Sequence, residues 1–155
     1  MYLYAFSQMR LPLFISVLML AAGLFASAQS FMPVPHQVHY HEGKGLKVSK
    51  GVVLLDVMGT AWDDIDFLTL KRKGVPMTVD YGSKVALENG VKQVSGAYKV
   101  DVSEEGISVI GYDERGAFYG LRTLRQIVEF FGTGTLPFCM VTDWPDNPRR
   151  GFTDG

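Results

Sequence analysis

The chain has 155 residues, a formal net charge of −1 and a hydrophobic fraction of 47%. This composition is typical of one folded domain and excludes a disordered tail. Because Lys and Arg form no basic stripe along the sequence, nucleic-acid binding is also excluded, and we expect no nucleic-acid partner.

The first 28 residues have the layout of a secretory signal peptide. An apolar run covers residues 11–25, Arg10 precedes it, and Ala26-Ser27-Ala28 supplies the small residues of a cleavage site. The run is short for a transmembrane helix, which needs about 20 apolar residues. We therefore predict cleavage after Ala28, export to the periplasm or the exterior of a bacterium, and no membrane partner after cleavage. A retained membrane anchor is the alternative.

Proline and β-branched residues predict extended structure at the start of the mature chain. Pro33 and Pro35 exclude a helix over residues 31–38, and residues 52–56 form a short apolar run typical of a buried strand. A helix is predicted next, with Asp63 or Asp64 as its N-cap and Gly74 after its last residue. Residues 75–79 and 85–87 are predicted to return as strands.

The second half of the chain predicts a hairpin followed by a long amphipathic helix. Residues 98–102 and 107–110 are the strands, and residues 103–106 are the turn. Asp113 caps the helix and Gly132 ends it. Its apolar face, predicted to be buried, contains Ala117, Phe118, Leu121, Leu124, Val128 and Phe131.

Two glycines one turn apart in this helix predict a close approach to a sheet. Each glycine costs roughly 1 kcal/mol of helix stability relative to alanine, so a packing reason is expected. We assign a structural role to Gly116, Phe118, Gly120, Leu121, Leu124 and Val128.

Together the elements predict an α+β fold, a single mostly antiparallel sheet with two helices packed on it. Residues 29–142 form this domain, with residues 136–142 as an extended crossing strand. Cys139, the single cysteine, lies in this strand and is predicted to be an inert buried thiol without a disulfide partner. Residues 143–155 are predicted to be a linker.

Residues 113–126, Asp-Glu-Arg-Gly-Ala-Phe-Tyr-Gly-Leu-Arg-Thr-Leu-Arg-Gln, closely resemble the end of a known small domain. That domain precedes the catalytic barrel in bacterial β-N-acetylhexosaminidases of glycoside hydrolase family 20. The opening Pro33-Val34-Pro35 and the segment from Asp143 to Gly151 resemble its two ends. The next most similar domain is that of the family 84 O-GlcNAcase-like enzymes. Asp154-Gly155 has the spacing of the Glu-Gly pair in those enzymes but lacks the glutamate. The resemblance implies that residues 143–155 lead into a (β/α)8 barrel.

The resemblance also implies an activity for the whole enzyme. Such enzymes hydrolyse terminal N-acetylhexosamine residues by a substrate-assisted retaining mechanism, with an acidic pair on the barrel. That pair is expected beyond Gly155, so we assign this chain no catalytic residue, no substrate-binding residue and no cofactor, and we expect it to be inactive alone. Its glycan contact would come only through the barrel, on which it would pack. The alternative is a stand-alone exported carbohydrate-binding or protein-interaction module.

Acidic and histidine clusters in the chain are predicted to be structural. Helix caps and turns explain the acidic groups, which are Asp63, Asp64 and Asp66, Glu104 and Glu105, and Asp113 and Glu114. In an extended segment His36 points away from His39 and His41, so no metal site is predicted.

Four aromatic residues suit the faces of a sugar ring, but they are expected to pack in the core or at a domain interface. They are Tyr112, Tyr119, Phe138 and Trp144. Trp144, beside Pro145, is predicted to lie at the seam with the barrel.

Overall fold

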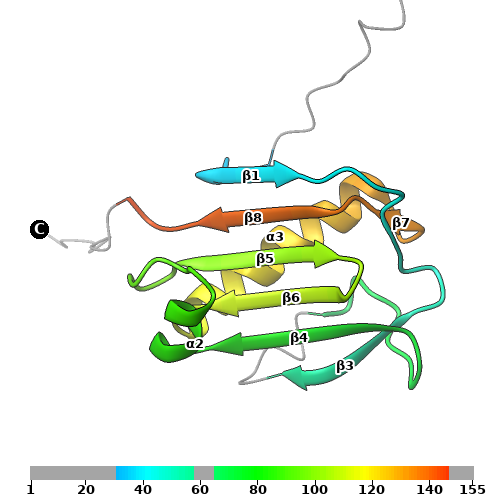
Figure 1. Cartoon of the computed structure of the whole chain (residues 1–155), viewed down its shortest axis with the longest axis horizontal. Coiled ribbons are helices and arrows are strands. Elements are labelled where there is room, and N and C mark those ends of the chain that lie inside the picture. Colours follow the sequence, from blue (N-terminus) through cyan, green and yellow to red (C-terminus); the bar gives the residue numbers. More distant parts are fainter. Residues whose placement is uncertain (1–30, 58–64, 147–155) are drawn as a thin grey trace, which may run out of the picture. The chain divides into compact units, whose positions relative to one another are not determined.

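The computed structural model describes residues 31–57 and 65–146. Their main sheet has the strand order β1-β8-β5-β6-β4-β3. These strands are β1 (Gln37–Tyr40), β8 (Cys139–Asp143), β5 (Tyr98–Ser103), β6 (Gly106–Gly111), β4 (Val75–Tyr81) and β3 (Val52–Val57). The β1-β8, β8-β5 and β5-β6 pairs are antiparallel, and the β6-β4 and β4-β3 pairs are parallel (Figure 1). The predicted α+β fold with a mostly antiparallel sheet is confirmed.

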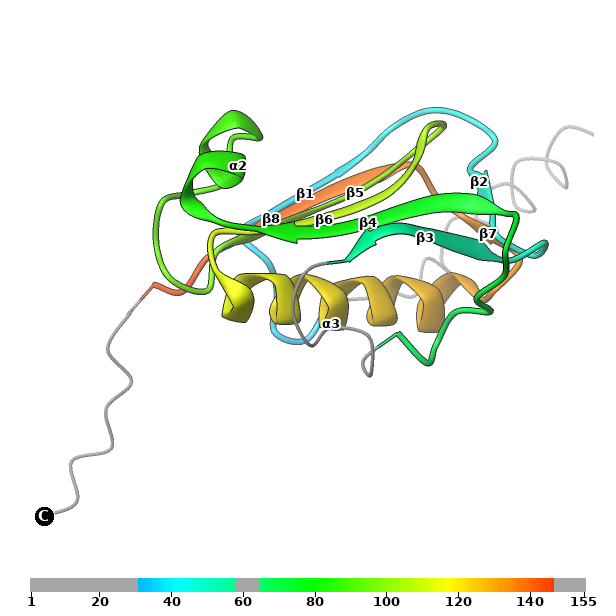
Figure 2. The same ribbon diagram turned by 90° about the horizontal axis from the view of Figure 1, so that it is seen from below.

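The long helix α3 (Glu114–Phe131) covers one face of the sheet, and the short helix α2 (Ser83–Glu88) lies on the other side at one end (Figure 2). A two-stranded sheet of β2 (Leu46–Lys47) and β7 (Thr135–Leu136) lies at the opposite end. None of the helices in the described part of the chain is long and apolar enough to span a bilayer.

Alternation along the strands builds the core between the sheet and α3. In β5, Tyr98, Val100 and Val102 are buried, whereas the residues between them are half-buried. Side chains from β4, β6 and β8 join them on the same face, with Met77, Val79, Ile107, Val109, Cys139 and Val141 all buried. Burial raises the pKa of the Cys139 thiol to about 11, which keeps it protonated and poorly nucleophilic near neutral pH.

Helix α3 begins and ends as its sequence predicts. The Asp113 carboxylate accepts a hydrogen bond from the Gly116 amide at 2.9 Å, and also from the Gly96 amide and the Ser95 hydroxyl. At the other end Gly132 has φ +78°, the left-handed region that favours glycine, and its amide bonds to the Val128 carbonyl.

Two predicted elements are wrong. The first is the helix predicted to end before Gly74. Its residues 65–73 form turns and a single bridge from Leu70 to Val52. Its predicted caps, Asp63 and Asp64, lie outside the described residues. The backbone of this segment bonds to β3 instead, from the Val52 amide to the Thr69 carbonyl and from the Lys71 amide to the Val52 carbonyl. The predicted strand at residues 85–87 is helix α2, in which Ala86 is buried and Leu87 is 68% exposed.

The predicted crossing strand at residues 136–142 is interrupted. Leu136 belongs to β7 and pairs with Leu46, whereas β8 starts at Cys139 and pairs with β1 and β5. Pro137 lies between the two strands and has no amide hydrogen to continue a ladder.

Candidate functional site

The residues assigned a structural role lie along α3, but not all of them face the sheet. Leu121, Leu124 and Val128 are buried at 1%, 0% and 4% exposure. Phe118 is 37% exposed and Phe131 is 39% exposed, so the prediction that these two rings are buried is wrong. The buried stripe runs instead through Gly116, Ala117, Gly120, Leu121, Thr123, Leu124, Ile127 and Val128.

The two glycines of α3 lie where the helix is closest to the sheet. A Cβ at Gly116 would be 2.1 Å from the carbonyl oxygen of Ala97, and a Cβ at Gly120 would be 2.6 Å from Cγ1 of Val109. Both contacts are closer than real Cβ atoms make, so a larger residue would force the backbone to move at Gly116 and the Val109 side chain or the helix to move at Gly120.

Polar and aromatic side chains gather where the chain leaves β8, at residues 143–146. The Trp144 ring stacks on the His36 imidazole, with centroids 4.1 Å apart and planes 20° from parallel. The Lys92 ammonium lies 4.4 Å from the Trp144 ring centroid. Trp144 also packs against a small second core of Ala86, Val91 and Ala97. This arrangement joins the start of the described chain, the loop after α2 and the end of β8.

His36 binds both carboxylates of this segment. Its Nδ1 lies 2.6 Å from Oδ1 of Asp143, and its Nε2 lies 2.8 Å from Oδ1 of Asp146. An ionised carboxylate only accepts hydrogen bonds, so two such contacts require an N–H on each ring nitrogen, which is the imidazolium form. The bond to Asp143, followed by the bond to Asp146, raises the pKa of His36 above its ordinary 6.5.

The network continues from Asp143 to α3. The Tyr98 hydroxyl lies 3.4 Å from Oδ2 of Asp143 and 2.7 Å from the Thr123 hydroxyl. Burial raises the pKa of Tyr98, so this phenol stays protonated and holds its hydrogen bonds at neutral pH. Segments that lie far apart in sequence are therefore tied together: His36, the end of β8 and the middle of α3. We call His36, Asp143, Trp144 and Asp146 the exit cluster.

The exit cluster makes a prediction about pH. Because the pKa of His36 is raised, its stabilising contribution is fully present below 6.5 and is lost as the pH rises through the raised value. Following the His36 ring protons by NMR should give a midpoint above 6.5, and Asp146→Asn should move it down. Glu42→Gln is the matched control and should leave the midpoint in place. A midpoint at or below 6.5 in the unsubstituted protein would contradict the doubly bonded imidazolium.

The acidic groups weighed as a catalytic pair have structural roles in the described residues. Asp113 caps α3, Glu104 and Glu105 lie at the exposed turn between β5 and β6, and Asp66 pairs with Arg125. Among residues 31–57 and 65–146, no group of three His, Cys, Asp or Glu side chains is arranged to hold a metal ion.

The four aromatic residues do not form one sugar-stacking platform. Trp144 and Tyr112 pack on the small second core, and Phe138 packs on the main core beside Gly43. Tyr119 is 41% exposed on α3, near Gly96. The exit cluster itself lacked a sequence signal, because His36 and Asp143 are 107 positions apart.

The described residues thus form a sheet with one long helix on its face, in which Asp113 caps the helix, Asp66 pairs with Arg125 and Asp143 binds His36. The sequence profile of glycosyl hydrolase family 20, domain 2, matches residues 28–144. The chain belongs to this family, as the hexosaminidase domain that precedes the barrel.

Relatives and solved structures agree with this assignment. The beta-hexosaminidase of Vibrio vulnificus is 28% identical over 132 residues, which are 84% of this chain and 15% of that protein. The structure of CpGH84D has a TM-score of 0.61 at 16% identity and covers 79% of this chain and 25% of its own. The β-N-acetylhexosaminidase of Bacteroides fragilis has a TM-score of 0.55 at 16% identity, with 76% and 25% covered. The chain thus spans a small part of each of these proteins.

Proposed function

We propose that this chain is the non-catalytic N-terminal part of an exported glycoside hydrolase that removes terminal N-acetylhexosamine residues. The observation that carries the proposal is the family match, which spans residues 28–144 and so includes every strand of the described sheet. The names of the relatives support the activity, since one is a beta-hexosaminidase and another a β-N-acetylhexosaminidase.

The chemistry is proposed to take place in a barrel encoded after Gly155. Glycoside hydrolysis usually needs two carboxyl groups that flank the scissile bond, and substrate-assisted enzymes replace one of them by the acetamido group of the sugar. Several described carboxylates already have other roles, with Asp113 in a helix cap, Glu104 and Glu105 in a turn, and Asp143 and Asp146 in the exit cluster, which supports placing the acidic pair elsewhere. The mechanism would be retaining and would use no cofactor.

The proposed division of the chain follows from the same reasoning. Residues 1–28 are the signal peptide, residues 29–142 are the domain, and residues 143–155 are the linker to the barrel. The family match ends at residue 144, within the exit cluster, which supports this boundary. The domain would act as a support that packs on the barrel, in the periplasm or outside the cell, with Trp144 at the seam.

We expect the chain from Gln29 to Gly155 to release no p-nitrophenol from p-nitrophenyl N-acetyl-β-glucosaminide, because the acidic pair is not in it. The matched control is the same chain extended by whatever the natural coding sequence encodes past Gly155. The extended protein should hydrolyse the substrate, and replacing its acidic pair by amides should abolish turnover.

Two results would contradict the proposal. An activity that stays with the short chain through purification would show that the domain is catalytic. A coding sequence that stops at Gly155, with a measurable affinity of the short chain for N-acetylglucosamine oligomers, would favour the stand-alone binding module.

A further inference from the structure

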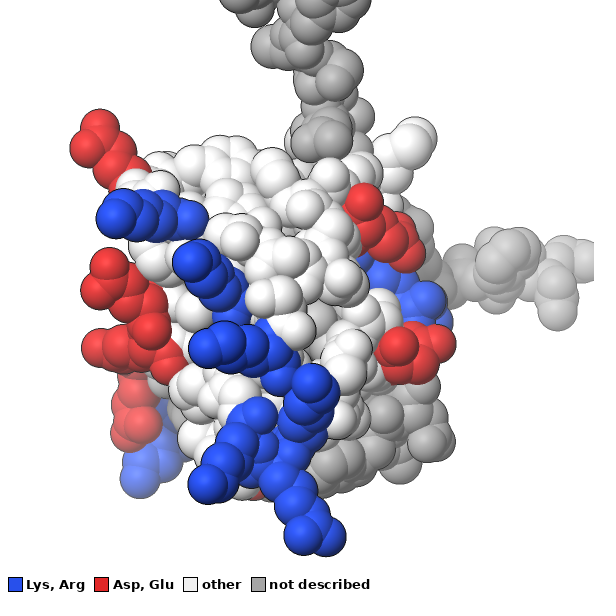
Figure 3. Space-filling model, turned by 90° about the vertical axis from the view of Figure 1, so that its right-hand side faces the viewer, with Lys and Arg blue, Asp and Glu red and all other residues white. Residues whose placement is uncertain are grey.

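Six basic side chains gather at one end of the sheet, and we call them the basic end. They come from two separate segments, β2 with the residues on either side of it and the turn before β4, and all six are exposed: Lys44, Lys47, Lys50, Lys71, Arg72 and Lys73. They are six of the 15 Lys and Arg residues in a chain whose net charge is −1. Figure 3 shows them as a band of positive charge across this end of the molecule.

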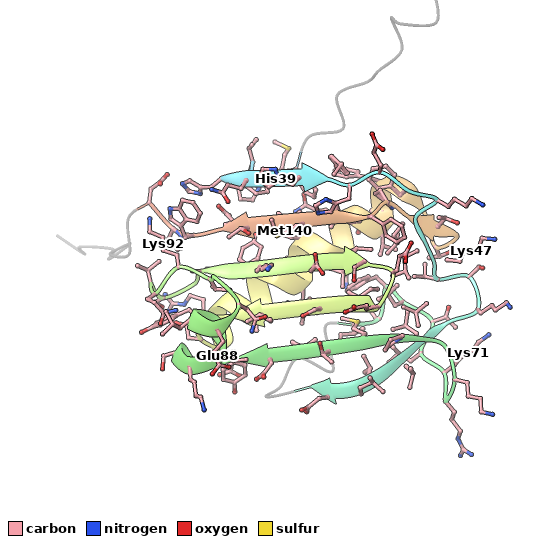
Figure 4. All side chains as sticks on the ribbon, in the orientation of Figure 1. His39, Lys47, Lys71, Glu88, Lys92 and Met140 are labelled. Atoms are coloured by element: carbon pink, nitrogen blue, oxygen red, sulfur yellow. The ribbon has the colours of Figure 1, made fainter. Side chains whose placement is uncertain are left out.

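Backbone hydrogen bonds hold the two segments side by side. The Val52 amide bonds to the Thr69 carbonyl at 2.9 Å, and the Val75 amide bonds to the Gly51 carbonyl at 3.0 Å. The stem of Lys71 lies so close to Gly51 that a Cβ there would be 2.8 Å from it. Lys47 and Lys71 are accordingly at the same end of the sheet in Figure 4. The positive charges are thus placed together by the fold and not only by a flexible loop.

The basic end forms no ion pair with the described residues around it. Within residues 31–57 and 65–146, the ion pairs involve His36 and Arg125, and none involves a residue of the basic end. Figure 3 shows acidic side chains beside the band rather than within it. Unpaired like charges in one place create a positive potential that attracts a polyanion.

The residue types of the basic end favour an extended anionic surface as the partner. Five of the six are lysines, which act as hydrated point charges, whereas recognition of individual phosphates in nucleic acids commonly uses the bidentate arginine fork. Leu70, next to Lys71, is 44% exposed and adds an apolar side chain to the basic ones. Basic residues with an exposed apolar neighbour are typical of contact with an anionic bilayer.

We propose that the basic end binds reversibly to the surface of an anionic membrane. The sequence alone predicts no membrane partner after cleavage of the signal peptide. Residues 44–50 and 71–73 are separated along the chain, and neither is a long basic run. The tertiary structure brings the two segments together, so that their positive charges form one surface. This proposal does not depend on the hydrolase activity, since the domain would bind in the same way whatever chain follows it.

The test is co-sedimentation of the chain from Gln29 to Gly155 with lipid vesicles. The chain starts at Gln29 because the apolar run at residues 11–25 would itself insert into a bilayer, and all of the described core lies after it. We expect binding to phosphatidylcholine vesicles that contain 30% phosphatidylglycerol, little binding to pure phosphatidylcholine, and loss of binding in 0.5 M NaCl.

Two sets of variants locate the contact. Lys71→Gln, Arg72→Gln and Lys73→Gln together should weaken binding on the order of 100-fold, at roughly five-fold for each charge removed. Lys47→Gln with Lys50→Gln should weaken it roughly 25-fold by the same rule. The matched control removes three charges elsewhere, with Lys84→Gln, Lys99→Gln and Arg115→Gln, and should change binding less than the first set.

Several outcomes would overturn the proposal. One is equal binding to neutral and anionic vesicles. Another is an equal loss of binding in the Lys71, Arg72 and Lys73 variant and in the control variant. A third is binding to heparin or DNA without binding to vesicles. Circular dichroism of each variant should match the unsubstituted chain, because all the substituted side chains lie at least partly in solvent.

Discussion

Replacing Gly116 by alanine is expected to destabilise the domain by about 2 kcal/mol. The added methyl group would lie 2.1 Å from the Ala97 carbonyl oxygen and 3.2 Å from the Gly111 Cα, both of which are backbone atoms that cannot rotate away. The Ala97 carbonyl already accepts a hydrogen bond from the Tyr112 amide at 2.8 Å, which the methyl group would disturb. Overpacking costs typically 1–3 kcal/mol, and a clash with backbone places this one near the top, at about 3 kcal/mol. The better helix propensity of alanine returns about 1 kcal/mol, which leaves about 2 kcal/mol.

Urea unfolding followed by circular dichroism measures this effect. Gly134→Ala is the matched control, since a Cβ at Gly134 meets no atom within 4 Å, and it should change the free energy of unfolding by less than about 0.5 kcal/mol. If Gly116→Ala is neutral or stabilising, α3 does not approach residue 97 as closely as described, and the structural role proposed for this glycine is lost.

Truncating Leu124 to alanine is expected to cost about 2–5 kcal/mol, the range for a buried leucine in a well-packed core. Leu124 is fully buried in the middle of α3 and belongs to the main core between the helix and the sheet. Removing its branched end would leave a cavity that the rigid sheet cannot fill by collapse. The same unfolding experiment measures the loss.

Phe118→Ala is the matched comparison, because its side chain is 37% exposed and makes contacts with Tyr119 and Arg122 on the helix surface. We expect it to cost clearly less than Leu124→Ala, although phenylalanine is the larger side chain. The two residues lie on the same predicted apolar face, so this pair of variants decides which part of that face is the core. Equal losses would place Phe118 in the core and show that the described rotation of α3 is wrong.

Elements with a strong local signal were predictable from the sequence. The hairpin of β5 and β6 follows from alternation on both sides of Ser103-Glu104-Glu105-Gly106. Helix α3 follows from its 3.6-residue period, its capping aspartate and its closing glycine. In each case residues only a few positions apart make the interactions that define the element.

Predictions failed where tertiary contacts compete with local preference. Residues 65–73 carry charges that suit helix ends, yet the Thr69 carbonyl and the Lys71 amide bond to β3, so their backbone is not available for a helix. Residues 85–87 alternate too briefly to separate a strand from a six-residue helix, and the helix is shown only by backbone hydrogen bonds, from the Ala86 amide to the Gly82 carbonyl and from the Asn89 amide to the Val85 carbonyl. The exposure of Phe118 depends on the rotation of α3 about its own axis relative to the sheet. The 3.6-residue period of the helix defines that rotation only approximately.

Local spacing of residue types was sufficient for the fold class, the capped helix and the family resemblance, because periodicity, capping and turn formation act between residues that are close along the chain. The exit cluster and the basic end arise only when the chain folds. His36 meets Asp143 across the β1–β8 pair, and the hydrogen bond from the Lys71 amide to the Val52 carbonyl brings Lys71 beside Gly51, the residue after Lys50. Charges and hydrogen bonds act through space, so which of them come together depends on strand pairing between distant segments, and pattern along the chain does not contain that pairing.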